Sequence, residues 1–192
     1  MKIQNNYKGC NCHKKSYESD INCFSNKKQC DCCICSPIYP TGPQGPQGIP
    51  GGLLNYADFY ALMPPDNAAT VAPGTDVSFP QDGPNSGSGI TRVSDTEFNL
   101  EQIGTYEVLF EVSITEAGQL ILTLNGVDLA YTVVGRATGA SQIIGMAIVS
   151  TTVINSILTV RNPSGNATAL SITPLAGGTR SVSAHLIITQ IG

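Results

Sequence analysis

The chain has 192 residues, of which 12% are charged, and its formal net charge at pH 7 is −4. This slightly acidic balance argues against nucleic acid and anionic membrane surfaces as partners. The sequence has no run of about 18 consecutive apolar residues, so we expect no membrane-spanning helix. The first residues, from Met1 to Tyr7, lack the apolar core of a secretory signal peptide, and we expect none.

Residues 1–40 form the first predicted unit, an attachment or cross-linking segment. Its apolar side chains are too few to offset the entropy lost on ordering, so we expect no core here. One chain has an odd number of thiols, and so would the trimer that is expected below. Complete oxidation therefore requires a disulfide bond to a molecule outside the trimer. We therefore expect disulfide cross-links to a neighbour. All the cysteines of the chain lie in this segment: Cys10, Cys12, Cys23, Cys30, Cys32, Cys33 and Cys35.

Two other interpretations of the cysteine-rich segment stay open. Tracts rich in Cys and His bind metals, and the crowded run from Cys30 to Cys35 has metallothionein-like spacing. However, the two Cys-x-x-Cys knuckles that zinc sites place about 15 to 20 residues apart are missing. The thiols can also stay reduced and unpaired. We expect His13 to be a solvated neighbour of these cysteines.

Residues 41–52 form the second predicted unit, a short collagen-like stalk. Glycine occupies every third position, at Gly42, Gly45, Gly48 and Gly51, and proline directly follows two of these glycines. Only glycine fits at the crowded axis of a collagen triple helix, so this spacing is typical of that structure. Three triplets span only about 30 Å, which is too short to hold three chains together unaided. The alternative is a flexible Gly/Pro linker.

Residues 53–192 form the third predicted unit, an all-β domain. Threonine, serine, valine, isoleucine and glycine dominate it, and short strand patterns alternate with turn signals, as in a sandwich or barrel. A mixed apolar run over 53–62 is stopped by Met63-Pro64-Pro65. We expect short strands at 77–79 and 96–100, with a loop over 81–89 between them.

The clearest strand covers residues 105–115. Its even-numbered residues from Tyr106 to Ile114 are apolar and are expected to be buried, while the other side is polar except at Leu109. On the next strand, Leu120, Leu122 and Leu124 are expected to face inward. Asn125-Gly126 predicts a type I′ hairpin, because both residues tolerate a positive φ. We expect its return strand over 127–133, followed by a loop over 135–139.

Two later segments, 143–154 and the last strand at 182–191, are apolar on both faces. Such strands belong inside a layered structure or at a subunit interface. Because one sheet face of a sandwich should meet water, we expect this face to meet copies of itself around a rotation axis. The residues expected at this trimer interface are His185, Ile187 and Ile191. The glycine triplets independently require a three-fold axis.

The glycine triplets and the domain that follows them resemble the collagen-like spore-surface proteins of endospore-forming Firmicutes. The resemblance rests on Gly104-Thr105-Tyr106-Glu107-Val108, Leu124-Asn125-Gly126 and the closing Ala184-His185-Leu186-Ile187-Ile188 run, and it covers roughly residues 42–192. It implies a homotrimeric C1q/TNF-like jelly roll in the exosporium or in a spore appendage. The best-known members have long glycosylated Gly-Pro-Thr runs, whereas this chain has three triplets. A short stalk or a stacked fibre subunit is therefore expected.

We expect no enzyme and no cofactor. The β domain has one histidine and no cysteine, and no Ser/His/Asp or Cys/His arrangement can be assembled in it. We expect His185 to be an interface or core side chain rather than a general base. Two functions stay open: a trimeric structural subunit of the spore surface, cross-linked through its cysteines to another protein, and a trimeric adhesin or phage tail-fibre tip that binds a glycan or receptor.

Overall fold

The computed structural model describes residues 54–66 and 70–192, and these belong to the unit Pro50–Gly192. The expectations for the cysteine-rich segment and the stalk lie outside these residues. Apart from one short 3-10 helix, η1 (Ala130–Thr132), the regular elements described are β-strands, so the predicted all-β class is confirmed. Among the described residues, no helix is long and apolar enough to cross a membrane.

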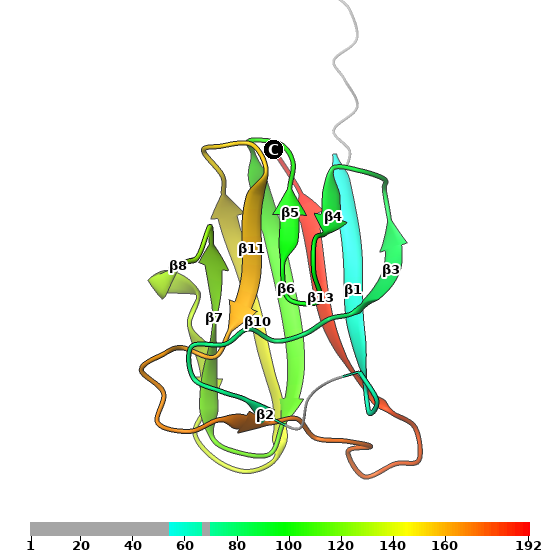
Figure 1. The fold of residues 1–192 in the computed structure, drawn as a ribbon, viewed down its shortest axis with the longest axis vertical. Helices are drawn as coiled ribbons and strands as arrows, with labels where there is room; N and C mark the ends of the chain where they lie inside the picture. Colours follow the sequence, from blue (N-terminus) through cyan, green and yellow to red (C-terminus); the bar gives the residue numbers. More distant parts are fainter. Residues whose placement is uncertain (1–53, 67–69) are drawn as a thin grey trace, which may run out of the picture. The chain divides into compact units, whose positions relative to one another are not determined.

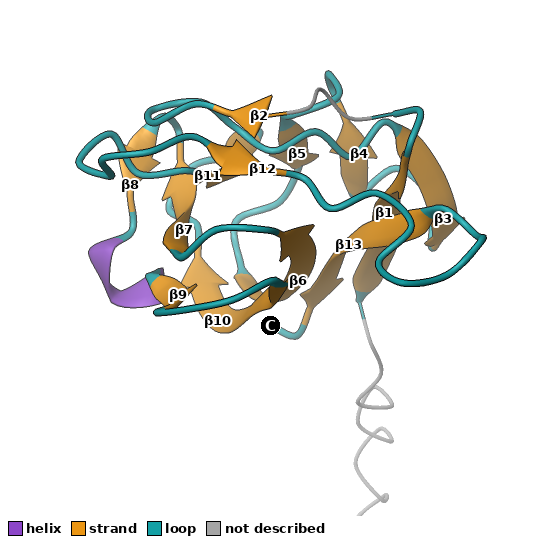
Figure 2. Ribbon diagram, turned by 90° about the horizontal axis from the view of Figure 1, so that it is seen from below, coloured by secondary structure: helices purple, strands orange, loops and turns teal. Residues whose placement is uncertain are grey.

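Two antiparallel sheets face each other (Figures 1 and 2). The first has the strand order β10-β6-β13-β1-β3, and the second has the order β4-β5-β11-β7-β8, with β9 also paired to β7. The first sheet contains β1 (Asn55–Met63), β3 (Gln81–Asn85), β6 (Thr105–Ile114), β10 (Ser141–Ser150) and β13 (Val182–Gln190). The second contains β4 (Ile90–Arg92), β5 (Phe98–Leu100), β7 (Gly118–Leu124), β8 (Val127–Asp128), β9 (Val134–Arg136) and β11 (Ser156–Arg161). A small third sheet pairs β2 (Thr70–Val71) with β12 (Leu170–Ser171).

The core lies between the two large sheets. All five even-numbered side chains of β6 from Tyr106 to Ile114 are buried, as the alternation predicted. Aromatic rings fill one side of the core, where the ring centroid of Phe98 lies 4.5 Å from that of Phe59 and 6.1 Å from that of Phe79. Burying each large apolar side chain stabilises the fold by roughly 1.5–3 kcal/mol.

The hairpin between β7 and β8 has the predicted turn. Asn125 and Gly126 have φ values of 52° and 79°, as a type I′ turn requires. The return strand, however, is shorter than predicted and ends at Asp128, where the chain passes into η1. Here the Thr132 hydroxyl accepts a hydrogen bond from the Leu122 amide and donates one to the Leu129 carbonyl. These side-chain hydrogen bonds take the place of the backbone hydrogen bonds that a longer return strand would form with β7.

Two predicted elements near the middle of the chain are wrong, and two others are strands that end earlier or begin later than expected. The expected strand at 77–79 is irregular chain, although Val77 and Phe79 are fully buried and their amides donate to carbonyls of β11 and of the β4–β5 turn. The expected loop over 81–89 begins with strand β3, which pairs with β1 across a register shift. Pro84 is tolerated in β3 because β3 is an edge strand. The expected strand at 96–100 is limited to β5, and the apolar segment 143–154 leaves the sheet at Ser150.

Candidate interaction surface

The outward face of the first sheet carries residues that the sequence placed at a subunit contact. On β1 the odd-numbered side chains are buried and the even-numbered ones face outward, whereas on β6 the even-numbered side chains are buried. The strand pairing therefore decides which outward side chains are neighbours. Two rows cross the face from β1 through β13 and β6 to β10. One row is Asp58, Ile187, Leu109 and Met146, and the next is Tyr60, His185, Glu111 and Ile144.

An apolar strip runs over three strands of this face. Met146 is 67% exposed and Ile144 is 59% exposed, which is unusual for large apolar side chains that lie so close together. Leu109 pairs with Met146 on one side and with Ile187 on the other, so the apolar surface is continuous across the strands. Contiguous exposed apolar surface is typical of protein–protein contacts. The strip consists of Leu109, Ile144, Met146, Ile148 and Ile187.

The polar part of the same face is centred on His185. Its Nδ1 lies 3.3 Å from Oδ1 of Asp58, and its ring centroid is 6.1 Å from that of Tyr60. Glu111 is the residue paired with His185 on β6. The His185 side chain is 40% exposed on an open sheet face, where it can pair with charges of a partner surface.

His185 and Ile187 both lie on the outward face, and Ile191 follows β13 as an exposed residue at the end of the sheet. That these residues contact another subunit stays a prediction. The sequence did not identify Ile144, Met146 and Ile148 as site residues. The sequence feature that could have identified them is that segment 143–154 is apolar on both faces. That pattern does not reveal that β10 belongs to the same sheet as β13, with β6 between them.

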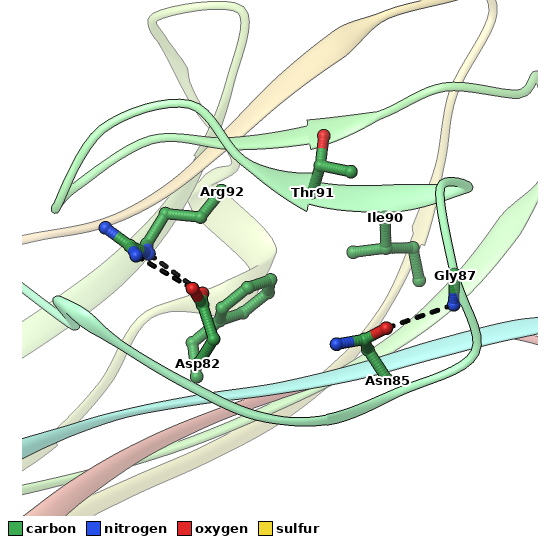
Figure 3. A pocket seen from close by; sticks show the side chains of 7 residues that line it. Asp82, Asn85, Gly87, Ile90, Thr91 and Arg92 are labelled. Carbon is green, nitrogen blue, oxygen red and sulfur yellow. Dashed lines mark hydrogen bonds and ion pairs between the residues drawn. The ribbon is translucent and has the colours of Figure 1, made fainter.

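A second feature is a pocket of about 260 Å³ at the edge where β3 and β4 approach each other (Figure 3). Arg92 forms two hydrogen bonds with Asp82, of 2.9 and 2.8 Å, and also contacts Asp95 at 3.2 Å. The hydrogen bond from Arg92 lowers the pKa of Asp82, and the same bond raises the pKa of Arg92. The pocket is lined by Phe59, Asp82, Asn85, Gly87, Ile90, Thr91 and Arg92.

Because Arg92 is already paired with two carboxylates, the pocket suits a small neutral polar molecule better than an anion. Asn85 accepts a hydrogen bond from the Gly87 amide at 3.1 Å, which fixes its side chain at the rim. The sequence did not predict this pocket, since Asp82, Asn85 and Gly87 come from a segment expected to be a loop and no motif distinguishes the lining residues. Among the described residues, no group of three or more His, Cys, Asp or Glu side chains is arranged to hold a metal ion.

Comparison with known proteins identifies the fold but not a family. No protein-family model matches the sequence, and no curated protein is similar to it. Among solved structures, the globular domain of zebrafish complement 1qA protein is 10% identical with a TM-score of 0.50, covering 71% of this chain and 96% of that one. Murine APRIL is 17% identical with a TM-score of 0.48 (70% and 98% covered), and the PRD1 vertex protein P5 is 17% identical with a TM-score of 0.49 (74% and 100% covered). The domain therefore has the C1q/TNF-like jelly-roll fold that the resemblance implied.

Proposed function

We propose that the chain is a non-enzymatic structural subunit of the bacterial spore surface and that its β domain forms a homotrimer. The observation that carries this proposal is the apolar strip on β6, β10 and β13. Each large side chain of the strip gains roughly 1.5–3 kcal/mol when it is fully removed from water, so contact between copies is favoured. Three-fold symmetry is supported by the glycine triplets, which require three chains.

The parts before the β domain complete the proposed subunit. Residues 41–52 serve as a short collagen-like stalk, and the cysteines from Cys10 to Cys35 attach the trimer to a neighbouring trimer or to another spore-surface protein. The odd number of thiols supports a bond outside the trimer. The location, in the exosporium or in an appendage fibre, rests on the resemblance of the sequence to collagen-like spore-surface proteins.

Sedimentation of the full chain in reductant tests the trimer. We expect a mass three times the 20.1 kDa of one chain. Met146→Asp should give monomers with unchanged β-sheet circular dichroism, because it places a charge in the apolar strip without touching the core. Val93→Asp is the matched control, since Val93 is 60% exposed in the β4–β5 turn and lies outside the strip. A monomeric wild-type chain would contradict the proposal.

Electrophoresis after boiling in SDS tests the cross-linking role of the cysteines. We expect a ladder of multimers that collapses only when reductant is added. Single-chain bands without reductant would exclude disulfide cross-links. In that case the zinc content of the purified full chain separates the metal-binding alternative from unpaired thiols.

The second candidate function is a trimeric adhesin or phage tail-fibre tip that binds a glycan or receptor. The pocket between β3 and β4 favours it, because its amide, hydroxyl and paired charges suit a neutral polar ligand such as a sugar. Binding of the full chain to immobilised glycans, lost in Asn85→Ala, would support this function. A chain that binds none of them and still cross-links would favour the structural subunit.

A further inference from the structure

Four strands of the first sheet, β1, β13, β6 and β10, carry three carboxylates on their outward face and one group that can become positive. Asp58 lies on β1, Glu107 and Glu111 lie on β6, and His185 lies on β13 between these two strands. Residues 53–192 contain no lysine, and none of their four arginines lies on these strands. Protonation of His185 is therefore the only way in which these strands can gain a positive charge.

Carboxylates flank His185 on both sides. On β1, Oδ1 of Asp58 lies 3.3 Å from Nδ1 of His185. On β6, Glu111 is directly opposite His185, and side chains in opposite positions have Cβ atoms about 4.5–5.5 Å apart. A neutral imidazole has one N–H donor, whereas a protonated imidazole has two. Only protonated His185 can therefore donate to a carboxylate on each side.

The other neighbours of His185 are neutral or lie further away. β1 and β6 are the strands paired with β13, and the third titratable side chain that they place beside His185 is Tyr60, whose ring centroid is 6.1 Å from that of His185. Glu107 lies further along β6, opposite Thr189, and β13 itself has no second charged residue. The two carboxylates beside His185 are therefore compensated only when His185 is protonated.

These charged groups adjoin the apolar strip. Glu111 is paired with Ile144 on β10, and Ile187, two residues after His185, is paired with Leu109 on β6. A second copy that covers the strip must therefore also approach Glu111 and His185. Removing a carboxylate from water is costly unless a positive partner remains with it, and like charges brought together at an interface repel each other.

We propose that protonation of His185 controls assembly of the β domains, so that trimers are stable near pH 6 and become weaker as the pH rises toward 8. This inference rests on the proposed trimer, whose interface includes this face. Histidine changes its charge between about pH 5 and 8. The charge that compensates the carboxylates is present at the lower pH and is lost as His185 releases its proton. Because three His185 side chains enter each trimer, we expect the association constant to fall at least about tenfold from pH 6 to pH 8.

Sedimentation of the full chain in reductant, at pH 6 and pH 8 and over a range of concentrations, tests this proposal. His185→Gln should have the same association constant at both pH values, because glutamine is polar but does not titrate. His13→Gln is the matched control, since His13 is the other histidine of the chain, and it should keep the wild-type pH dependence. Both variants keep all the cysteines, so an effect caused by thiols would persist in His185→Gln.

Two further variants test the sign of the effect. His185→Lys keeps a positive charge at both pH values, so its trimers should be about as stable at pH 8 as at pH 6. Glu111→Gln removes the carboxylate opposite His185 and should strengthen the trimer several-fold at pH 8. Glu101→Gln is the control for this change, because Glu101 is an exposed carboxylate that follows β5 and lies outside the face. Circular dichroism checks that each variant keeps its β-sheet content.

The outcomes separate this proposal from the trimer itself. Wild-type trimers that are equally stable at both pH values, or more stable at pH 8, would overturn the proposal and leave the trimer intact. A pH dependence that persists in His185→Gln would also overturn it, since another group would be responsible. Monomers at both pH values would refute the trimer and this control with it.

Exchange of chains between trimers extends the test to assemblies that do not dissociate on dilution. Isotope-labelled and unlabelled trimers are mixed, and native mass spectrometry follows the appearance of mixed trimers. We expect exchange to be several-fold faster at pH 8 than at pH 6 in the wild-type chain and in His13→Gln. Equal exchange rates at the two pH values would overturn the proposal.

Discussion

Glu116, in the turn between β6 and β7, shows how one partly exposed carboxylate ties two parts of the domain together. Its Oε2 accepts a hydrogen bond of 2.7 Å from the amide of Ser171 in β12. Hydrogen bonds from Ser171 lower the pKa of Glu116 from 4.5 to about 2. Arg136 donates to the Glu116 carbonyl as well, so the turn is held from both sides.

The lowered pKa predicts how acid affects the domain. Because the folded form holds the carboxylate charged, this stabilisation is present above pH 4.5 and is lost as the pH falls toward 2. In Glu116→Gln we expect a lower midpoint of urea unfolding at pH 7 and a smaller loss of stability between pH 4.5 and 2. Water screens the partly exposed carboxylate, so the change in stability will be modest. Glu101→Gln is the control, and equal pH profiles for the two variants would contradict the prediction.

Strands β6 and β10 form the longest pairing of the domain. The absence of a side chain at Gly145 lets the Phe110 ring lie close to the backbone of β10. A Cβ at this position would overlap the ring of Phe110 and crowd Val134. Gly145→Ala should therefore destabilise the domain by about 1–3 kcal/mol, as overpacked cores do. Chemical unfolding measures the change. Gly165→Ala is the control, because nothing lies within 4 Å of its new methyl group; an equal effect of both variants would refute this account.

Elements with a regular pattern were predictable from the sequence, and elements fixed by distant contacts were not. The alternation on β6 and the Asn125-Gly126 turn are local signals, and both are confirmed. Phe79 is apolar because it fills the core against Phe98, not because it lies in a strand, and the sequence cannot separate these two causes. Strand β3 depends on its pairing with β1, which outweighs the turn propensity of its residues.

The candidate surface was predictable only in part for the same reason. The apolar outward side of β13 was visible in the sequence, and it led to His185 and Ile187. The continuity of the strip required the sheet order β10-β6-β13, which is a non-local property. Leu109 illustrates this: it interrupts the polar side of β6, and it joins the apolar residues of both neighbouring strands.

At the scale of the whole chain, the β domain has three surfaces with different properties. The apolar strip covers a sheet face. Exposed apolar side chains also lie at the end where β1 begins, and the loops 163–169 and 176–181 of the opposite end consist mainly of small and polar residues. This arrangement fits a subunit that is attached through its N-terminal side and presents its polar end to water.

Substituting Gly45 tests whether residues 41–52 form a triple helix. Gly45→Ala should loosen residues 41–52, because the axis of a triple helix has no room for a methyl group. We expect the trimer to persist in sedimentation, since the apolar strip holds it, while a broad-specificity protease cuts between residues 42 and 48 faster than in the wild-type chain. Gln44→Ala is the matched control, because the residue before each glycine points away from the axis. If the wild-type chain is already cut as fast as Gly45→Ala, residues 41–52 are a flexible linker. The apolar strip would then be the only feature that supports a trimer.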